Sequence, residues 1–145
     1  MENKLRSIIA IYVTRFLLPF IFAFGIYVQI NSFDSPGGGF QAGVLMASAL
    51  ILHSIVFGHQ STLKVVPFNF LITFACFGMS IYLIAGMISS LAGKTFLDYG
   101  MLSDNGVEGQ KLGIFSIELG VGFAVFSTIC IIFYSFVGEE TRKTR

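Results

Sequence analysis

Charged residues are scarce in this chain, and their scarcity decides its class. Only 12% of the 145 residues are charged, and the mean hydropathy is +0.81. Soluble domains carry about 25% charged residues. The few Lys, Arg, Asp and Glu residues fall almost wholly between long apolar runs or at the chain ends. A soluble globular domain is therefore excluded, and the sequence predicts an integral membrane protein.

Cysteine is also scarce, and no cluster of reactive side chains is evident in the sequence. Cys76 and Cys130 both lie inside apolar runs, which predicts packing residues rather than a disulfide or a metal site. No basic face suits nucleic acid. No nucleophile is accompanied by a partnering histidine and carboxylate. We therefore expect no enzyme, no cofactor, no metal and no nucleic-acid partner.

Four apolar runs are each long enough to cross a hydrocarbon layer of about 30 Å. They cover residues 7–30, 40–57, 67–91 and 112–137. The predicted fold is an all-α membrane protein, with residues 1–145 forming one domain of four transmembrane helices. The loop 92–111 is the longest connection, and its Asn105-Gly106 pair predicts a tight turn in a small hairpin or flap.

Basic residues divide unequally between the two predicted sides of the membrane. One side holds Lys4, Arg6, Lys64, Arg142, Lys143 and Arg145, and the other holds Lys94 and Lys111. Cytoplasmic segments carry the excess of Lys and Arg, so both termini are predicted to be cytoplasmic. Arg15, inside the first run, most simply extends back to the inner lipid headgroups.

A glycine-rich segment joins the first two apolar runs. It reads Asp34-Ser-Pro-Gly-Gly-Gly-Phe-Gln-Ala-Gly43 and contains the only three consecutive glycines in the chain. Glycine lets another backbone come close. A nucleotide-binding loop would continue with Lys and then Ser or Thr, but here Phe40 and Gln41 follow. We interpret the segment as a close-packing joint, at the outer face, where another helix or subunit meets this one.

Small residues form stripes on the last three predicted helices. The stripes contain Gly43, Ala47, Ser54 and Gly58; Ala75, Gly78, Gly86 and Ser89; and Gly113, Ser116, Gly120, Ala124 and Ser127. Such stripes allow close helix contact in lipid, so they predict a compact bundle with few lipid-facing positions. Glu118 lies away from the stripe on its helix. That helix then needs partners on two faces, which favours a component of a larger assembly.

Three ionisable residues are candidates for an ion path. Glu118 lies within the last apolar run, where a carboxylate costs about 2.5–3.5 kcal/mol on insertion scales. It suits a proton or cation relay or a partner for a cationic side chain, although a protonated, hydrogen-bonded carboxyl is the structural alternative. His53 suits proton exchange, or a headgroup or helix-end contact. Asp34 suits cation binding or, more simply, capping of the second helix. Glu118 and His53 are predicted to lie at different depths in the membrane, so they are not expected to form a direct pair.

Two blocks of the sequence resemble the signature of the MnhB/MrpB family. The first block contains Pro36, Gly37, Gly38, Gly39, Phe40, Gln41 and Gly43, and the second contains Glu118, Gly120 and Gly122. We take these residues as the helix and subunit packing motif. Ala42 stands where relatives commonly have another glycine. The chain length and the four predicted helices are also similar to those of the family.

The resemblance implies a small membrane component, of the MnhB type, of a multisubunit Na+/H+ antiporter (the Mrp type). Its partners would be the other membrane subunits, the transported ions Na+ and H+, and the bilayer of a prokaryotic cytoplasmic membrane. It would contribute to assembly and to the ion path in Na+ efflux and pH homeostasis. Two alternatives stay open: a homologous component of a complex I-like membrane-bound hydrogenase or respiratory module, and a purely structural linker.

Overall fold

A computed structural model describes residues 2–32, 38–91, 93, 95–97, 99 and 106–143. Within these residues the chain forms five helices and no strand. The helices are α1 Glu2–Ile30, α2 Gly39–Phe57, α3 His59–Val65, α4 Phe68–Leu91 and α5 Gly106–Lys143. All except α3 are long and apolar enough to cross a membrane. The all-α prediction with four spans is confirmed.

The structure differs from the sequence analysis in two local features. Gly106 is the first residue of α5, so it starts a helix rather than forming half of a tight turn; Asn105 lies outside the described residues. Helical hydrogen bonds continue past the apolar run, and Glu108 in the first turn complements the helix dipole. The helix α3 was not predicted. Gly58, at a φ of 92°, separates it from α2, and the chain then resumes helical geometry at once.

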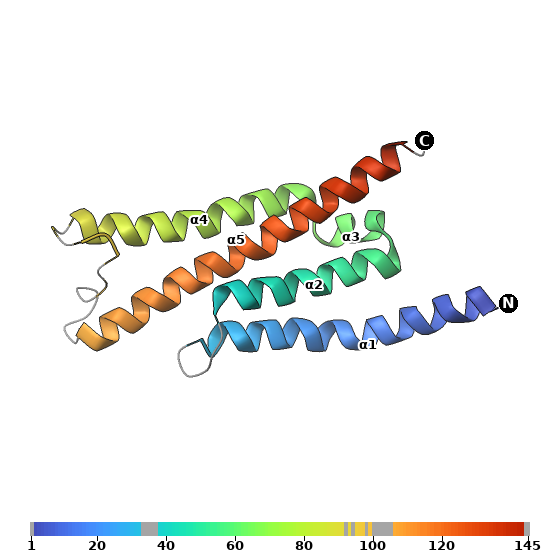
Figure 1. Ribbon diagram of the computed structural model, residues 1–145, viewed down its shortest axis with the longest axis horizontal. Helices are drawn as coiled ribbons and strands as arrows, with labels where there is room; N and C mark the ends of the chain where they lie inside the picture. The colour runs from blue at the N-terminus through green and yellow to red at the C-terminus, as the bar shows by residue number, and fades with distance from the viewer. Residues whose placement is uncertain are drawn as a thin grey trace.

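The four long helices lie in a row rather than around a common axis. Figure 1 shows α1 and α4 at the two edges, with α2 and α5 between them. Accordingly α5 packs against both α4 and α2, while α1 packs mainly against α2. Both chain ends lie at the same end of the molecule (Figure 1). The cytoplasmic location of that end stays a prediction.

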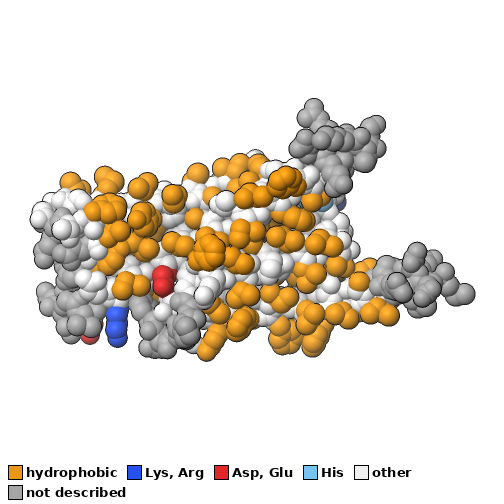
Figure 2. Space-filling view, viewed as in Figure 1, with side chains coloured by type: hydrophobic (Ala, Val, Ile, Leu, Met, Phe, Trp, Pro, Cys, Tyr) orange, Lys and Arg blue, Asp and Glu red, His pale blue; other side chains and the backbone are white. Residues whose placement is uncertain are grey.

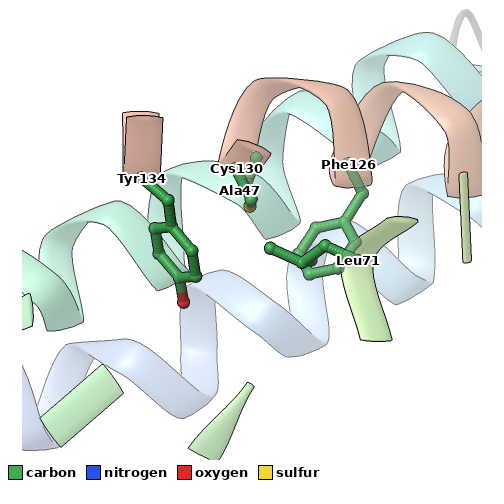
Figure 3. Close-up of a cluster of buried hydrophobic side chains, with 5 residues drawn as sticks. All are labelled: Ala47, Leu71, Phe126, Cys130 and Tyr134. Carbon is green, nitrogen blue, oxygen red and sulfur yellow. The ribbon is translucent and has the colours of Figure 1, made fainter. Parts of the chain in front are cut away.

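The buried core lies where α2, α4 and α5 meet. Figure 3 shows its five members, Ala47, Leu71, Phe126, Cys130 and Tyr134. The Tyr134 hydroxyl donates a hydrogen bond of 3.3 Å to the Val66 carbonyl oxygen, which ties α5 to the segment before α4. Cys130 is fully buried, which confirms its predicted packing role. Cys76 is exposed, so the same prediction for Cys76 is wrong within this chain.

The prediction of a bundle with few lipid-facing positions is wrong. The four spans are only 11%, 28%, 17% and 28% buried within the chain. Large apolar side chains stay open on every span, including Phe16, Phe40 and Phe136. Figure 2 shows hydrophobic side chains over much of the visible face. A row of helices leaves both broad sides uncovered, and these sides are available to lipid and to other subunits.

Candidate functional site

The helix α2 begins directly against the backbone of α5, and Gly39 makes this possible. A Cβ built on Gly39 would overlap the carbonyl oxygen of Glu118 and lie 2.7 Å from the carbonyl carbon. It would also lie 2.9 Å from the amide nitrogen of Gly122. No side chain fits in this position. The glycine-rich block and the second block of the sequence therefore meet within this one chain.

The contact continues along the same face of α2. A Cβ on Gly43 would lie 2.7 Å from the carbonyl oxygen of Gly122 and 3.0 Å from the amide nitrogen of Phe126. Two helices this close exchange dispersion contacts along their backbones, the usual basis of association in lipid. We call this contact, made by Gly38, Gly39, Gly43, Glu118 and Gly122, the α2–α5 joint.

The opposite face of α5 is also covered within the chain. A Cβ on Gly120 would lie 2.7 Å from the carbonyl oxygen of Gly78, and the reverse construction gives 2.5 Å. The small stripes of α4 and α5 thus pack against each other. This overturns the inference that the last helix needs outside partners on two faces. The chain supplies both neighbours itself, α2 for the Glu118 face and α4 for the stripe.

Glu118 places its carboxyl group beside the start of α2. A Cβ built on Gly38, the residue before the helix, would lie 3.4 Å from Glu118 Oε1. Gly38 has no side chain with which to cap α2, and the first turn contains no acidic residue. The unpaired amides and the dipole at a helix N-terminus favour negative charge nearby. The Glu118 carboxyl therefore lies where α2 has no acidic side chain of its own.

Gln29 of α1 completes the cluster, and the sequence analysis did not identify it. Its side chain is 6% exposed, and its amide oxygen lies against Gly122. Within the described residues, neither of its amide atoms has a hydrogen-bond partner, and the same is true of Glu118 Oε2 and Ser32 Oγ. The available signal was the polar Gln29 near the end of the first apolar run. We call Gln29, Glu118 and the backbone of Gly38, Gly39 and Gly122 the Glu118 cluster.

His53 lies far from this cluster. It is fourteen residues along α2 from Gly39, or roughly 21 Å at the rise of an α-helix. This agrees with the expectation of different depths. Its Nδ1 lies 2.8 Å from the Thr62 hydroxyl oxygen, and that hydroxyl donates to the Gly58 carbonyl at 3.2 Å. One hydroxyl has one proton. Because that proton goes to the Gly58 carbonyl, the Thr62 oxygen is the acceptor and His53 Nδ1–H the donor in the first contact.

The other predicted site residues divide into two groups. Asp34, Pro36 and Gly37 lie outside the described residues. Phe40 and Gln41 are exposed on α2, and Phe40 lines a groove together with Ala124 and Val125 of α5. Among the described residues, no group of three or more His, Cys, Asp and Glu side chains is arranged to hold a metal ion. The Glu118 cluster is the candidate functional site.

Comparison with known proteins identifies the family of this chain. The family described as "Domain related to MnhB subunit of Na+/H+ antiporter" matches residues 9–131, a range that includes both halves of the α2–α5 joint. The chain is 30% identical over 140 residues to the B subunit of the Na(+)/H(+) antiporter of Alkalihalophilus pseudofirmus, covering 89% of this chain and 96% of that protein.

A second relative gives a similar result. The chain is 30% identical over 141 residues to the putative antiporter subunit mnhB2 of Staphylococcus aureus strain Newman, covering 95% of this chain and 99% of that protein. Both alignments run nearly the full length of the relatives, through all four membrane-spanning helices. With its two glycine blocks joined in one contact, the chain belongs to the MnhB family.

Proposed function

We propose that this chain is the MnhB component of a multisubunit Na+/H+ antiporter, and that Glu118 is its ion-handling residue. The family match and the full-length similarity to two antiporter subunits support the first part. The four apolar spans suit a multi-pass protein of a prokaryotic cell membrane. Its partners are the other membrane subunits, and its role is in transport rather than in catalysis of a chemical reaction.

The observation that carries the second part is the buried, unpartnered oxygen of Glu118 within a membrane span. Glu118 Oε2 and both amide atoms of Gln29 lack hydrogen-bond partners within the described chain. Burying such atoms costs about 1–3 kcal/mol each. Buried polar groups without hydrogen-bond partners at a helix joint are typical of functional sites. Polar residues within a membrane mark ion and proton pathways.

The chemistry of the cluster suits exchange between a proton and a cation. A carboxylate binds either a proton or a hard cation, which prefers oxygen ligands. The Gln29 amide oxygen lies against Gly122, about one turn along α5 from Glu118, and is proposed as a second, neutral oxygen ligand. The α2 N-terminus favours the negative carboxylate after the ion leaves. A site that binds only one of the two ions at a time contributes directly to antiport.

The predicted orientation of the chain indicates on which side of the membrane this site lies. With both termini cytoplasmic, as the basic residues indicate, α2 and α5 both run inward, and the Glu118 cluster faces the external half of the bilayer. His53 then lies near the cytoplasmic end of α2. Asp34 retains its proposed role as a cation ligand at the outer end of the first helix, but the cap position of α2 is occupied by Gly38 rather than by Asp34.

The test replaces Glu118 by Gln in the complete antiporter complex, with Glu108→Gln as the matched control. Glu108 lies exposed in the first turn of the same helix. In Glu118→Gln, antiport in membrane vesicles should fall roughly a hundredfold, the low end of what a positioned proton-transfer group contributes. Glu108→Gln should leave it unchanged.

The composition of the complex, purified in mild detergent, separates the alternatives. Complex of normal subunit composition with normal antiport in Glu118→Gln would make the chain a structural linker. Loss of the complex in that variant would make Glu118 a packing residue. Co-purification of the wild-type chain with hydrogenase subunits would support the respiratory alternative. Both relatives described above are named as antiporter subunits, which favours the antiporter.

A further inference from the structure

An apolar groove opens between α1 and the body formed by α2, α4 and α5. Its volume is about 600 Å³. The groove exists because α1 packs along α2 and leaves α4 at the other edge of the row (Figure 1). The walls include Phe22, Met46, Phe74 and Phe126, and among the described residues that line it, His53 is the only one with a polar side chain.

The polar end of the groove also carries a positive charge. Arg15 precedes Leu18 and Pro19, two lining residues, by about one turn on the same face of α1. Its guanidinium carbon lies 6.0 Å from the centre of the Phe57 ring. That ring stacks on His53, with 4.7 Å between ring centres. The groove therefore has an apolar body and a cationic end, on the side of the membrane where both termini lie.

The large size of the lining side chains bears on whether a protein helix or a lipid hydrocarbon chain occupies the groove. Membrane helices associate through small residues, and the helix contacts within this chain follow that rule at Gly39, Gly43, Gly78, Gly120 and Gly122. The groove walls are instead made mainly of Phe, Leu, Ile, Val and Met side chains. Among the described residues, the lining contains no glycine at which a helix backbone could come close. A flexible hydrocarbon chain can follow such bulky apolar side chains, which favours a lipid chain as the occupant.

We propose that the groove binds one acyl chain of an anionic phospholipid, with the phosphate at Arg15 and the ring of His53 at the same end. Guanidinium binds phosphate with paired hydrogen bonds, and Arg15 already lies at the groove's cationic end. Lipid bound here would hold α1 against the rest of the chain. The proposal does not depend on transport by Glu118, which lies at the opposite end of α2.

The absence of tryptophan from the natural sequence allows a direct test on the full-length chain. Phe70→Trp introduces a single fluorophore in the groove wall, and Phe77→Trp places one on the same helix outside the lining. Each variant is reconstituted in phosphatidylcholine nanodiscs that contain a small fraction of either phosphatidylglycerol or phosphatidylcholine with brominated acyl chains. Bromine quenches a tryptophan that it contacts.

The groove tryptophan should be quenched preferentially by the anionic lipid, by roughly fivefold in apparent affinity, the equivalent of one basic residue's attraction to anionic lipid. The Phe77→Trp signal should show no preference. Adding Arg15→Gln should abolish the preference, while Arg15→Lys, which keeps the charge, should retain part of it. Circular dichroism confirms that each variant is folded.

Three results would overturn the proposal. Equal quenching of the groove tryptophan by both lipids would mean contact with bulk bilayer only. A preference that survives Arg15→Gln would remove the proposed phosphate contact. A groove tryptophan quenched by neither lipid would mean that protein covers the groove, most simply a second copy of this chain.

Discussion

Gly39 of α2 lies against the carbonyl oxygen of Glu118 on α5, with no space for a side chain between them. This contact brings together the two blocks that the sequence analysis identified separately. It also fixes where the Glu118 carboxyl lies, because the start of α2 cannot move away without opening the α2–α5 joint. The packing role of the glycines and the proposed role of Glu118 are therefore one structural feature.

Gly39→Ala should destabilise the protein, because the new methyl group meets backbone atoms rather than a flexible side chain. Overpacking of this kind costs about 1–3 kcal/mol, and a backbone contact leaves little room for relaxation. Thermal unfolding of the detergent-solubilised chain measures the effect as a lower Tm. Gly138→Ala is the control, since a Cβ there meets nothing within 4 Å. That variant should be neutral or slightly more stable. Equal Tm values for the two variants would contradict the joint.

The position of this contact shows what could be predicted from the sequence and what could not. The class and the four spans follow from hydropathy and composition, and the two motifs follow from their resemblance to the family signature. That Gly39 meets Glu118 does not, because the choice of neighbouring helices depends on topology rather than on any local pattern. Gly38, grouped with Gly39 by sequence, has room for a Cβ at 3.4 Å from Glu118 Oε1, so these two glycines are not equivalent.

Other differences have equally specific causes. Gln29 was missed because a neutral amide near the end of an apolar run changes the hydropathy of the run very little. The helix α3 was missed because its polar residues are typical of a loop. The number of exposed apolar residues was underestimated because a row of helices and a closed bundle share the same small-residue stripes.

Gln29→Met should separate stability from transport. Methionine is close in size and apolar, so it removes two buried amide atoms that lack partners, and the free energy of unfolding should stay constant or rise by about 1 kcal/mol. If the amide oxygen is a cation ligand of the Glu118 cluster, antiport should fall in the same samples. Sites that sacrifice stability for function behave in this way. An assembled variant with normal antiport would exclude Gln29 from the ion path.

Thr62→Val should loosen the turn between α2 and α3. The Thr62 side chain is fully buried, accepts from His53 and donates to the Gly58 carbonyl. Its removal takes a hydrogen-bond partner from the half-buried His53 ring and one donor from the exposed Gly58 carbonyl, which keeps the backbone amides of Ser61 and Thr62, at a cost of about 0.5–1.5 kcal/mol. Thr73→Val is the control, because the exposed Thr73 hydroxyl donates only to the Asn69 carbonyl in its own helix. Comparable losses of Tm in both variants would contradict the specific role of Thr62.

Tyr99 lies outside the membrane spans, in the segment between α4 and α5. It should make the stability of the protein sensitive to high pH. Its side chain is 8% exposed and packs against Gly113. Burial, and secondarily the charge of Tyr82, raise the pKa of Tyr99 above its ordinary value of 10.0. The protonated, neutral form is therefore favoured in the folded state. Its contribution to stability is complete below pH 10 and is lost as the pH rises from about 10 through the higher folded pKa.

Tyr99→Phe should remove this alkaline sensitivity, because phenylalanine has no proton to lose. The variant and the wild type should have similar Tm values near pH 8, and the variant should be the more stable of the two above pH 10. Tyr27→Phe is the control: Tyr27 is 57% exposed near the end of α1 and should change neither value. Thermal unfolding measured across this pH range provides the comparison. Parallel curves for Tyr99→Phe and the wild type up to pH 11 would show that Tyr99 ionises without loss of packing against Gly113.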